Sequence, residues 1–220
     1  MGNVGLGLTL AALLTGLMTG CAAEKADSDG ATGATGASAT TTAKVAKRGG
    51  SVGASGSACE LPVTFDIAEF WKAKGVDAEE ASAATGDLAD LADAFLRQGP
   101  VTMACEVDAK PAGKIGFLRV WTGEPGDTDA RAVLEDFVAA EQGASGARYS
   151  TVKAGDIAGT EVAYVTTSEL LEETKQEHAF AVATSEGPVV LHLGGMDTAE
   201  HEAMLPAYEL AKSTLHTTTG

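Results

Sequence analysis

The spacing of apolar positions predicts three helices in the second part of the chain. Apolar residues recur at intervals of three and four over residues 86–97, 129–141 and 197–215, so each segment would bury one face. Asp127, Thr128 or Asp129 can cap the second helix, and Asp197 stands three residues before Glu200 at the start of the third. Pro206 lies inside the third helix and should bend it. The inward positions are Leu88, Leu91, Ala92 and Phe95, then Ala130, Val133, Leu134, Phe137 and Val138, then Met204, Leu205, Tyr208, Ala211 and Leu215.

Short runs rich in β-branched and aromatic residues predict strands around these helices. A turn at residues 111–114 makes residues 101–107 and 115–121 expected hairpin partners. The order of elements predicts an α+β fold, a mainly antiparallel sheet with helices packed on both faces. The expected strands are residues 60–66, 101–107, 115–121, 148–153, 160–168, 177–185 and 189–193.

An apolar stretch of small residues occupies positions 4–20 and ends at Cys21. Its centre, residues 6–17, is typical of an export signal and is shorter than the about 20 apolar residues that cross a bilayer. The segment Leu17-Met18-Thr19-Gly20-Cys21 resembles the lipobox of bacterial lipoproteins. Residues 1–20 are therefore predicted to be a signal peptide, and Cys21 is predicted to carry the acyl chains that anchor the protein to a membrane. Residues 1–20 contain no Lys or Arg, so we expect an upstream start or an atypical signal, and a leader cleaved elsewhere is the alternative.

Residues 21–57 consist mostly of Ala, Gly, Ser and Thr and contain no aromatic residue. Such a composition buries too little apolar surface to offset the entropy of ordering, which predicts a disordered linker. Residues 58–216 remain for one folded domain.

The net charge of −16 argues against nucleic acid as a partner, because nucleic-acid sites need clustered Lys and Arg. Two interpretations stay open, namely that the acidity serves solubility or that it favours a basic partner.

Cys59 and Cys105 remain as a pair when Cys21 is assigned to the anchor. In an oxidising compartment such a pair predicts a disulfide.

Catalytic and metal sites are not indicated by any motif. The chain has neither a phosphate-binding glycine loop nor a G-x-S-x-G nucleophile elbow, so no catalytic residue and no cofactor are predicted. His192, Asp197 and His201 are residue types that suit zinc, but the HExxH pattern is absent, and surface or structural roles are favoured over a metal. Phe70 and Trp71 follow the first expected strand and are interpreted as core residues or, alternatively, as the lining of a binding groove.

Several stretches together resemble the PsbP-like fold, which is also that of LpqN-type lipoproteins of mycobacteria. These are the strand of residues 116–121, the helix of residues 129–141, the meander of residues 163–193 and the long last helix. The lipobox, the Ala-rich linker and residues 187–195 are similar to lipoproteins of actinobacteria. The resemblance implies a non-enzymatic domain that docks to other molecules of the envelope.

The predicted function is therefore that of an exported lipoprotein, anchored through Cys21 to the outer face of the cell membrane, that binds a protein partner or a ligand. Two alternatives are a carrier of an apolar envelope molecule and an envelope enzyme. A carrier would need an enclosed cavity, and an enzyme would need perturbed carboxylates and histidines gathered in one cleft.

Overall fold

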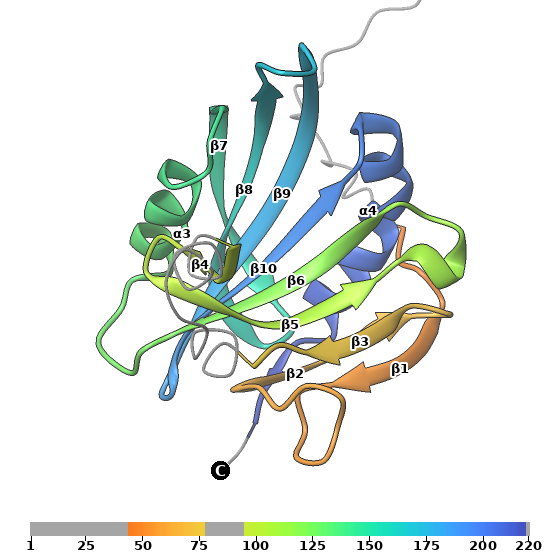
Figure 1. Ribbon diagram of the computed structural model, residues 1–220. Helices are drawn as coiled ribbons and strands as arrows, with labels where there is room; N and C mark the ends of the chain where they lie inside the picture. Colours follow the sequence, from red (N-terminus) through yellow and green to blue (C-terminus); the bar gives the residue numbers. More distant parts are fainter. Residues whose placement is uncertain (1–43, 78–94, 219–220) are drawn as a thin grey trace, which may run out of the picture. The chain divides into compact units, whose positions relative to one another are not determined.

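An antiparallel sheet dominates the computed structural model, which describes residues 44–77 and 95–218 (Figure 1). All of these residues belong to one unit of the chain, Thr41–Gly220. The large sheet has the strand order β3-β5-β6-β10-β9-β8-β7, and β4 pairs with β5. Its strands are β3 (Lys72–Gly75), β4 (Arg97–Gln98), β5 (Val101–Asp108), β6 (Gly116–Gly123), β7 (Ala144–Ala154), β8 (Ile157–Ser168), β9 (Glu173–Thr184) and β10 (Gly187–Gly195).

Every pair of neighbouring strands in this sheet is antiparallel, which confirms the predicted mainly antiparallel sheet. β5 and β6 are hairpin partners as expected, and the 3-10 turn η1 (Lys110–Ala112) lies between them. A second, small sheet has the order β1-β2-β11 and comprises β1 (Arg48–Val52), β2 (Val63–Ala68) and β11 (His216–Thr217).

Two described helices begin at the predicted aspartates. The helix α3 (Ala130–Ala139) is capped by Asp129, whose side chain accepts a hydrogen bond from the Ala132 amide at 2.9 Å. The helix α4 (Thr198–Ser213) is capped in the same way by Asp197, with the Glu200 amide at 2.8 Å. Both caps satisfy amide groups that the first turn of a helix leaves without a partner.

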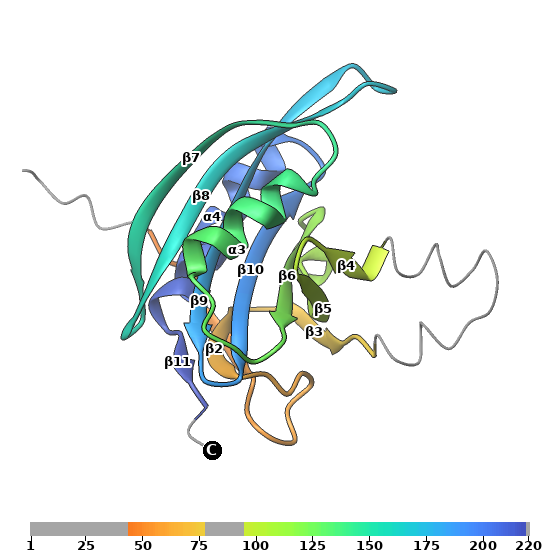
Figure 2. The same cartoon turned by 90° about the vertical axis from the view of Figure 1, so that its left-hand side faces the viewer.

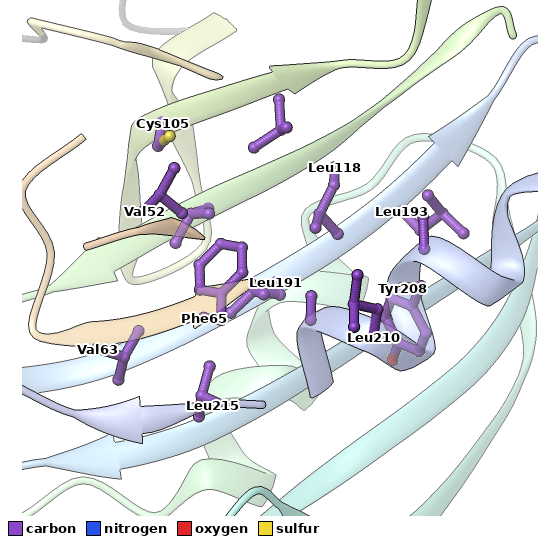
Figure 3. Close-up of a cluster of buried hydrophobic side chains, with 14 of the residues drawn as sticks. Val52, Val63, Phe65, Cys105, Leu118, Leu191, Leu193, Tyr208, Leu210 and Leu215 are labelled. Carbon is purple, nitrogen blue, oxygen red and sulfur yellow. The ribbon is translucent and has the colours of Figure 1, made fainter. Parts of the chain in front are cut away.

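Alternate residues of the central strands contribute to two separate hydrophobic clusters. On β9, Ala179 and Ala181 belong to the cluster that contains α3, whereas Phe180 and Val182 belong to the cluster that contains α4. Successive side chains of a strand point in opposite directions, so the two clusters lie on opposite sides of β9. Figure 3 shows the cluster of α4, in which the small sheet and β10 also take part.

The prediction of a disordered linker over residues 21–57 is wrong for its last part. Residues 48–52 form β1 and pair with β2, and Val52 is only 2% exposed and belongs to the core. Two of the glycines that make this stretch resemble a linker are required by close packing. A side chain at Gly49 would collide with the backbone of Glu69, and one at Gly53 would collide with the backbone of Val63.

The predicted helix over residues 86–97 lies largely outside the described residues. Its described end departs from the expectation, because Phe95 is exposed and Arg97 already belongs to β4. The last helix ends at Ser213 rather than at residue 215, although Leu215 is buried as predicted. Pro206 lies within that helix, and its carbonyl accepts a hydrogen bond from the Ala46 amide at 2.8 Å.

Candidate functional site

The hairpin formed by β8 and β9 extends beyond the rest of the large sheet, as Figure 2 shows at its upper end. The last residue of β10 that pairs with β9 is Leu193, opposite His178, whereas β8 and β9 stay paired as far as Ser168 and Glu173. On the other side of the hairpin, β7 stays paired with β8 as far as Thr166, so only the end of the hairpin extends beyond both neighbouring strands. The turn that follows, residues 169–172, is called the hairpin tip and consists of Glu169, Leu170, Leu171 and Glu172.

The hairpin tip exposes two adjacent leucines. Leu170 is 92% exposed and Leu171 is 65% exposed. Single exposed apolar residues are common on protein surfaces, but adjacent ones on a projecting element mark candidate contact surfaces. The hairpin tip is therefore the first part of the candidate site.

Four polar side chains at the base of the hairpin link it to β10. They are called the base cluster and are Tyr164 on β8, Lys175 and Glu177 on β9, and His192 on β10. The Nζ atom of Lys175 lies 2.7 Å from Oε1 of Glu177 and donates to the Gly195 carbonyl at 3.2 Å. Nε2 of His192 lies 3.1 Å from the Tyr164 hydroxyl and 3.3 Å from Oε2 of Glu177. Three strands are thereby joined where the hairpin leaves the sheet.

The base cluster holds a buried negative charge. Glu177 is 1% exposed, and burial acts to raise its pKa, but His192 and then Lys175 outweigh burial and hold the pKa of this carboxyl below its usual value. Burial raises the pKa of Tyr164, so its hydroxyl stays protonated. Oε2 of Glu177 has no hydrogen-bond partner among the described residues, and its nearest polar contact is Nε2 of His192 at 3.3 Å.

A second polar group lies on the α4 side of β9. Nδ1 of His178 is 2.7 Å from Nε2 of His201, and the Tyr208 hydroxyl donates to Glu161 at 2.9 Å. Lys212 also donates to Glu161, at 2.7 Å. Burial lowers the pKa of His178, and burial together with the charge of His178 lowers the pKa of His201 to about 4. Both rings are therefore neutral at neutral pH.

The residues that suit zinc are not brought together. His192 contacts Phe137 of α3, His201 lies in α4 against His178, and Asp197 caps α4. No group of three or more potential metal ligands is found in the part of the chain that the structure describes.

Phe70 and Trp71, proposed as a possible groove, point to different environments. Trp71 is 7% exposed and belongs to the core, whereas Phe70 is 63% exposed and has a positive φ of 69°. Both residues lie in the tight turn between β2 and β3. Two open hollows found in the described surface are lined by other residues, and the groove at Phe70 and Trp71 stays a prediction.

The structure contains the predicted disulfide between Cys59 and Cys105, with their Cα atoms 5.8 Å apart. It joins the segment before β2 to β5 of the large sheet. Cys21, the predicted lipidation site, lies outside the described residues. Within residues 44–77 and 95–218, no helix has the length and apolar character needed to cross a membrane.

Sequence reasoning missed both parts of the candidate site. Residues 170–176 were expected only as a connection between two strands. The available signal is the segment Glu169-Leu170-Leu171-Glu172, in which two leucines stand between acids and lack the periodicity of a buried element. The base cluster has no comparable signal, because its residues meet only through the register of three strands.

This geometry defines a mainly antiparallel α+β domain with a projecting hairpin whose tip exposes two leucines. The chain belongs to a lipoprotein family, described as uncharacterised lipoprotein, and the match covers residues 29–215. Membership of this family associates the protein with the cell envelope. The match begins after Cys21, so lipidation at that residue stays a prediction.

Among solved structures, the chain is similar to the solution structure of cyanobacterial PsbP (CyanoP) from Synechocystis sp. PCC 6803. The sequences are 12% identical, the TM-score is 0.46, and the match covers 77% of this chain and 98% of the other. At this level of similarity the PsbP-like assignment stays a prediction. No curated protein matches the chain.

Proposed function

We propose that this protein is a lipid-anchored docking protein of the cell envelope, without enzymatic activity, that binds a protein partner through the hairpin tip. In this proposal Cys21 carries the lipid, residues 22–43 form the tether, and the domain that begins near residue 44 presents the hairpin outside the cell membrane. The observation that carries the proposal is the exposure of Leu170 and Leu171 on a projecting turn.

The exposed leucines supply a source of binding free energy that folding leaves unused. Burying one leucine side chain contributes about 1.5–3 kcal/mol. Folding of the domain leaves Leu170 and Leu171 in water, since neither belongs to the two hydrophobic clusters. Binding of a partner that covers both leucines would therefore be stabilised by the free energy of burying them.

The base cluster supports docking because it limits the motion of the hairpin. Two-stranded ribbons are only marginally stable by themselves. The contacts of Lys175 with Gly195 and of His192 with Tyr164 tie both hairpin strands to β10, near the point where the pairing of β9 with β10 ends, and β7 pairs with β8 as far as Thr166. A contact surface that is ordered before binding loses less conformational entropy when it binds.

The proposal is tested with the full chain and a Cys21→Ser variant produced in the same cells. Intact cells are treated with a membrane-permeant cross-linker, and membranes and soluble fractions are then separated. The wild-type chain should be recovered in membranes with a reproducible protein partner, and Cys21→Ser should move to the soluble fraction. Recovery of the wild-type chain without any specific partner, or membrane recovery of Cys21→Ser equal to that of the wild type, would contradict the proposal.

A further inference from the structure

We infer that the partner surface for the hairpin tip is an apolar protein pocket rimmed by Lys or Arg side chains. This inference rests on the proposed function and adds the chemistry of the partner. It follows from the charges that surround the two leucines, from the shape of the turn and from the place of the nearest lysine.

Carboxylates surround the exposed leucines. Glu169 and Glu172 flank Leu170 and Leu171 directly, and Glu173 follows as the first residue of β9. All three glutamates are exposed, and no ion pair found among the described residues involves them. The tip therefore presents two exposed leucines between carboxylates, together called the rim, that form no ion pair with the described part of the chain.

The nearest lysine on the hairpin does not neutralise this rim. Lys175 turns to the base cluster, where its Nζ atom contacts Glu177 at 2.7 Å and the Gly195 carbonyl at 3.2 Å. Because Glu177 is buried and ionised, Lys175 is held there by a charge that water screens poorly. Within residues 44–77 and 95–218 no ion pair complements the rim, and a partner molecule with basic side chains would supply the missing positive charge.

The backbone of the turn gives further support for a role of the acidic side chains. Glu172 has a positive φ of 53°, a conformation that glycine and asparagine adopt more readily than glutamate does. Strained backbone at a non-glycine residue is concentrated at binding sites. A glutamate at this position places a carboxylate beside Leu171 at some cost in backbone strain.

Electrostatics favours a basic protein over two other candidate occupants, which are an anionic membrane surface and a second copy of the chain. A membrane rich in anionic lipids attracts basic segments and repels carboxylates near its surface. A second copy of the same chain carries a net charge of −16 and repels the rim as well. A protein pocket with basic groups at its edge complements both the leucines and the glutamates.

The test uses the full, lipid-anchored chain with a benzophenone amino acid at position 170, in membranes of the cells that produce it. The matched control carries the same amino acid at Asp156, which is highly exposed in the turn at the other end of β8. Illumination should give a discrete protein adduct from position 170 and no such adduct from position 156. Mass spectrometry of the adduct should map the partner contact to a segment with Lys or Arg beside apolar residues.

Variants in the same background separate the apolar and the acidic contributions. Leu171→Ser should lower the adduct yield by at least about tenfold, because it removes one buried leucine from the contact. Changing Glu169, Glu172 and Glu173 together to Gln should lower the adduct yield about threefold to tenfold. A salt concentration of 1 M, at which the Debye length is about 3 Å, should lower the adduct yield of the unsubstituted tip to a similar extent.

Four outcomes would overturn the inference. Three of them are an adduct with lipid, an adduct with a second copy of the chain, and a protein adduct whose yield is unchanged by salt and by the three Gln substitutions. The fourth is a cross-link to a specific envelope protein from position 156 but not from position 170, which would mean that the partner lies elsewhere on the domain. The inference about the tip then fails, whereas docking at the envelope stands.

Discussion

At the scale of single residues, the base of the hairpin depends on Glu177. Its two carboxylate oxygens face Lys175 and His192, and it is almost completely buried. A buried charge persists only where it is paired, because removing it from water costs several kcal/mol. No sequence pattern announces this arrangement, since the four residues of the base cluster lie on three strands and meet only after those strands have paired.

Replacing Glu177 by Gln should lower the free energy of unfolding by about 2 kcal/mol, because Lys175 loses its charged partner and His192 loses its contact with the carboxylate. Urea unfolding of the domain measures this change. Glu173→Gln is the matched control, since Glu173 is exposed on the same strand and its replacement should change stability by less than about 0.5 kcal/mol. Equal stability of the two variants would show that the buried contacts contribute nothing.

The pair of His178 and His201 predicts how stability depends on pH. Both have a pKa below the usual 6.5, and that of His201 is about 4 in the folded protein. Between these two values the unfolded chain binds a proton that the folded protein does not, so stability should fall as the pH drops from 6.5 to 4. Below that range, the lowered pKa of Glu177 adds a further loss as its carboxylate is protonated.

Denaturant unfolding at a series of pH values should show this decline in the wild type. His201→Gln removes the titrating group and keeps hydrogen-bonding capacity toward His178, so its stability should decline less steeply over the same interval. An identical slope in both proteins would assign the pH dependence to other groups.

At the scale of elements, the sequence predicted the helices and strands that are marked by a short stretch of sequence, such as a cap or a turn. Asp129 and Asp197 cap α3 and α4, and the turn after β5 makes the expected hairpin with β6. β1 escaped prediction because Gly49 allows it to pack closely beside the end of β2, and composition cannot distinguish such a glycine from one in a flexible linker. The length of the β8–β9 hairpin was also beyond prediction, since strand alternation does not show where neighbouring strands end.

Because β1 pairs with β2 and buries Val52, we predict that the domain needs residues 48–52 for its full stability. A chain that begins at residue 44 should be at least about 2 kcal/mol more stable than one that begins at residue 53, because the shorter chain loses the buried Val52 and the pairing with β2. Urea unfolding of both chains measures the difference. Equal stability of the two chains would show that β1 contributes nothing to the stability of the domain.

The two leucines of the hairpin tip should not contribute to the stability of the fold. Changing Leu170 and Leu171 together to Ser should alter the free energy of unfolding by less than about 0.5 kcal/mol, since both side chains already lie in water. Leu191→Ser is the contrasting variant, because Leu191 is fully buried on β10 and its loss should destabilise the domain by several kcal/mol. A large effect of the tip substitutions would show that the leucines pack in the folded protein.

At the scale of the whole molecule, an acidic domain of a lipoprotein family carries its exposed leucines on an element that projects from the sheet. The lipobox at Cys21 predicted the envelope association that the family supports, and the net charge left a basic partner open as one interpretation. Of the two residues named for a groove, Trp71 belongs to the core and Phe70 is exposed.

The most direct measurement compares the lipid-anchored wild type with the Leu170→Ser/Leu171→Ser chain in the same membranes. Both are cross-linked in intact cells, and the recovered partner is quantified by mass spectrometry relative to the lipoprotein itself. We predict equal membrane recovery of the two chains and a loss of the partner of at least about tenfold for the variant. Equal partner recovery with both chains would contradict docking through the hairpin tip.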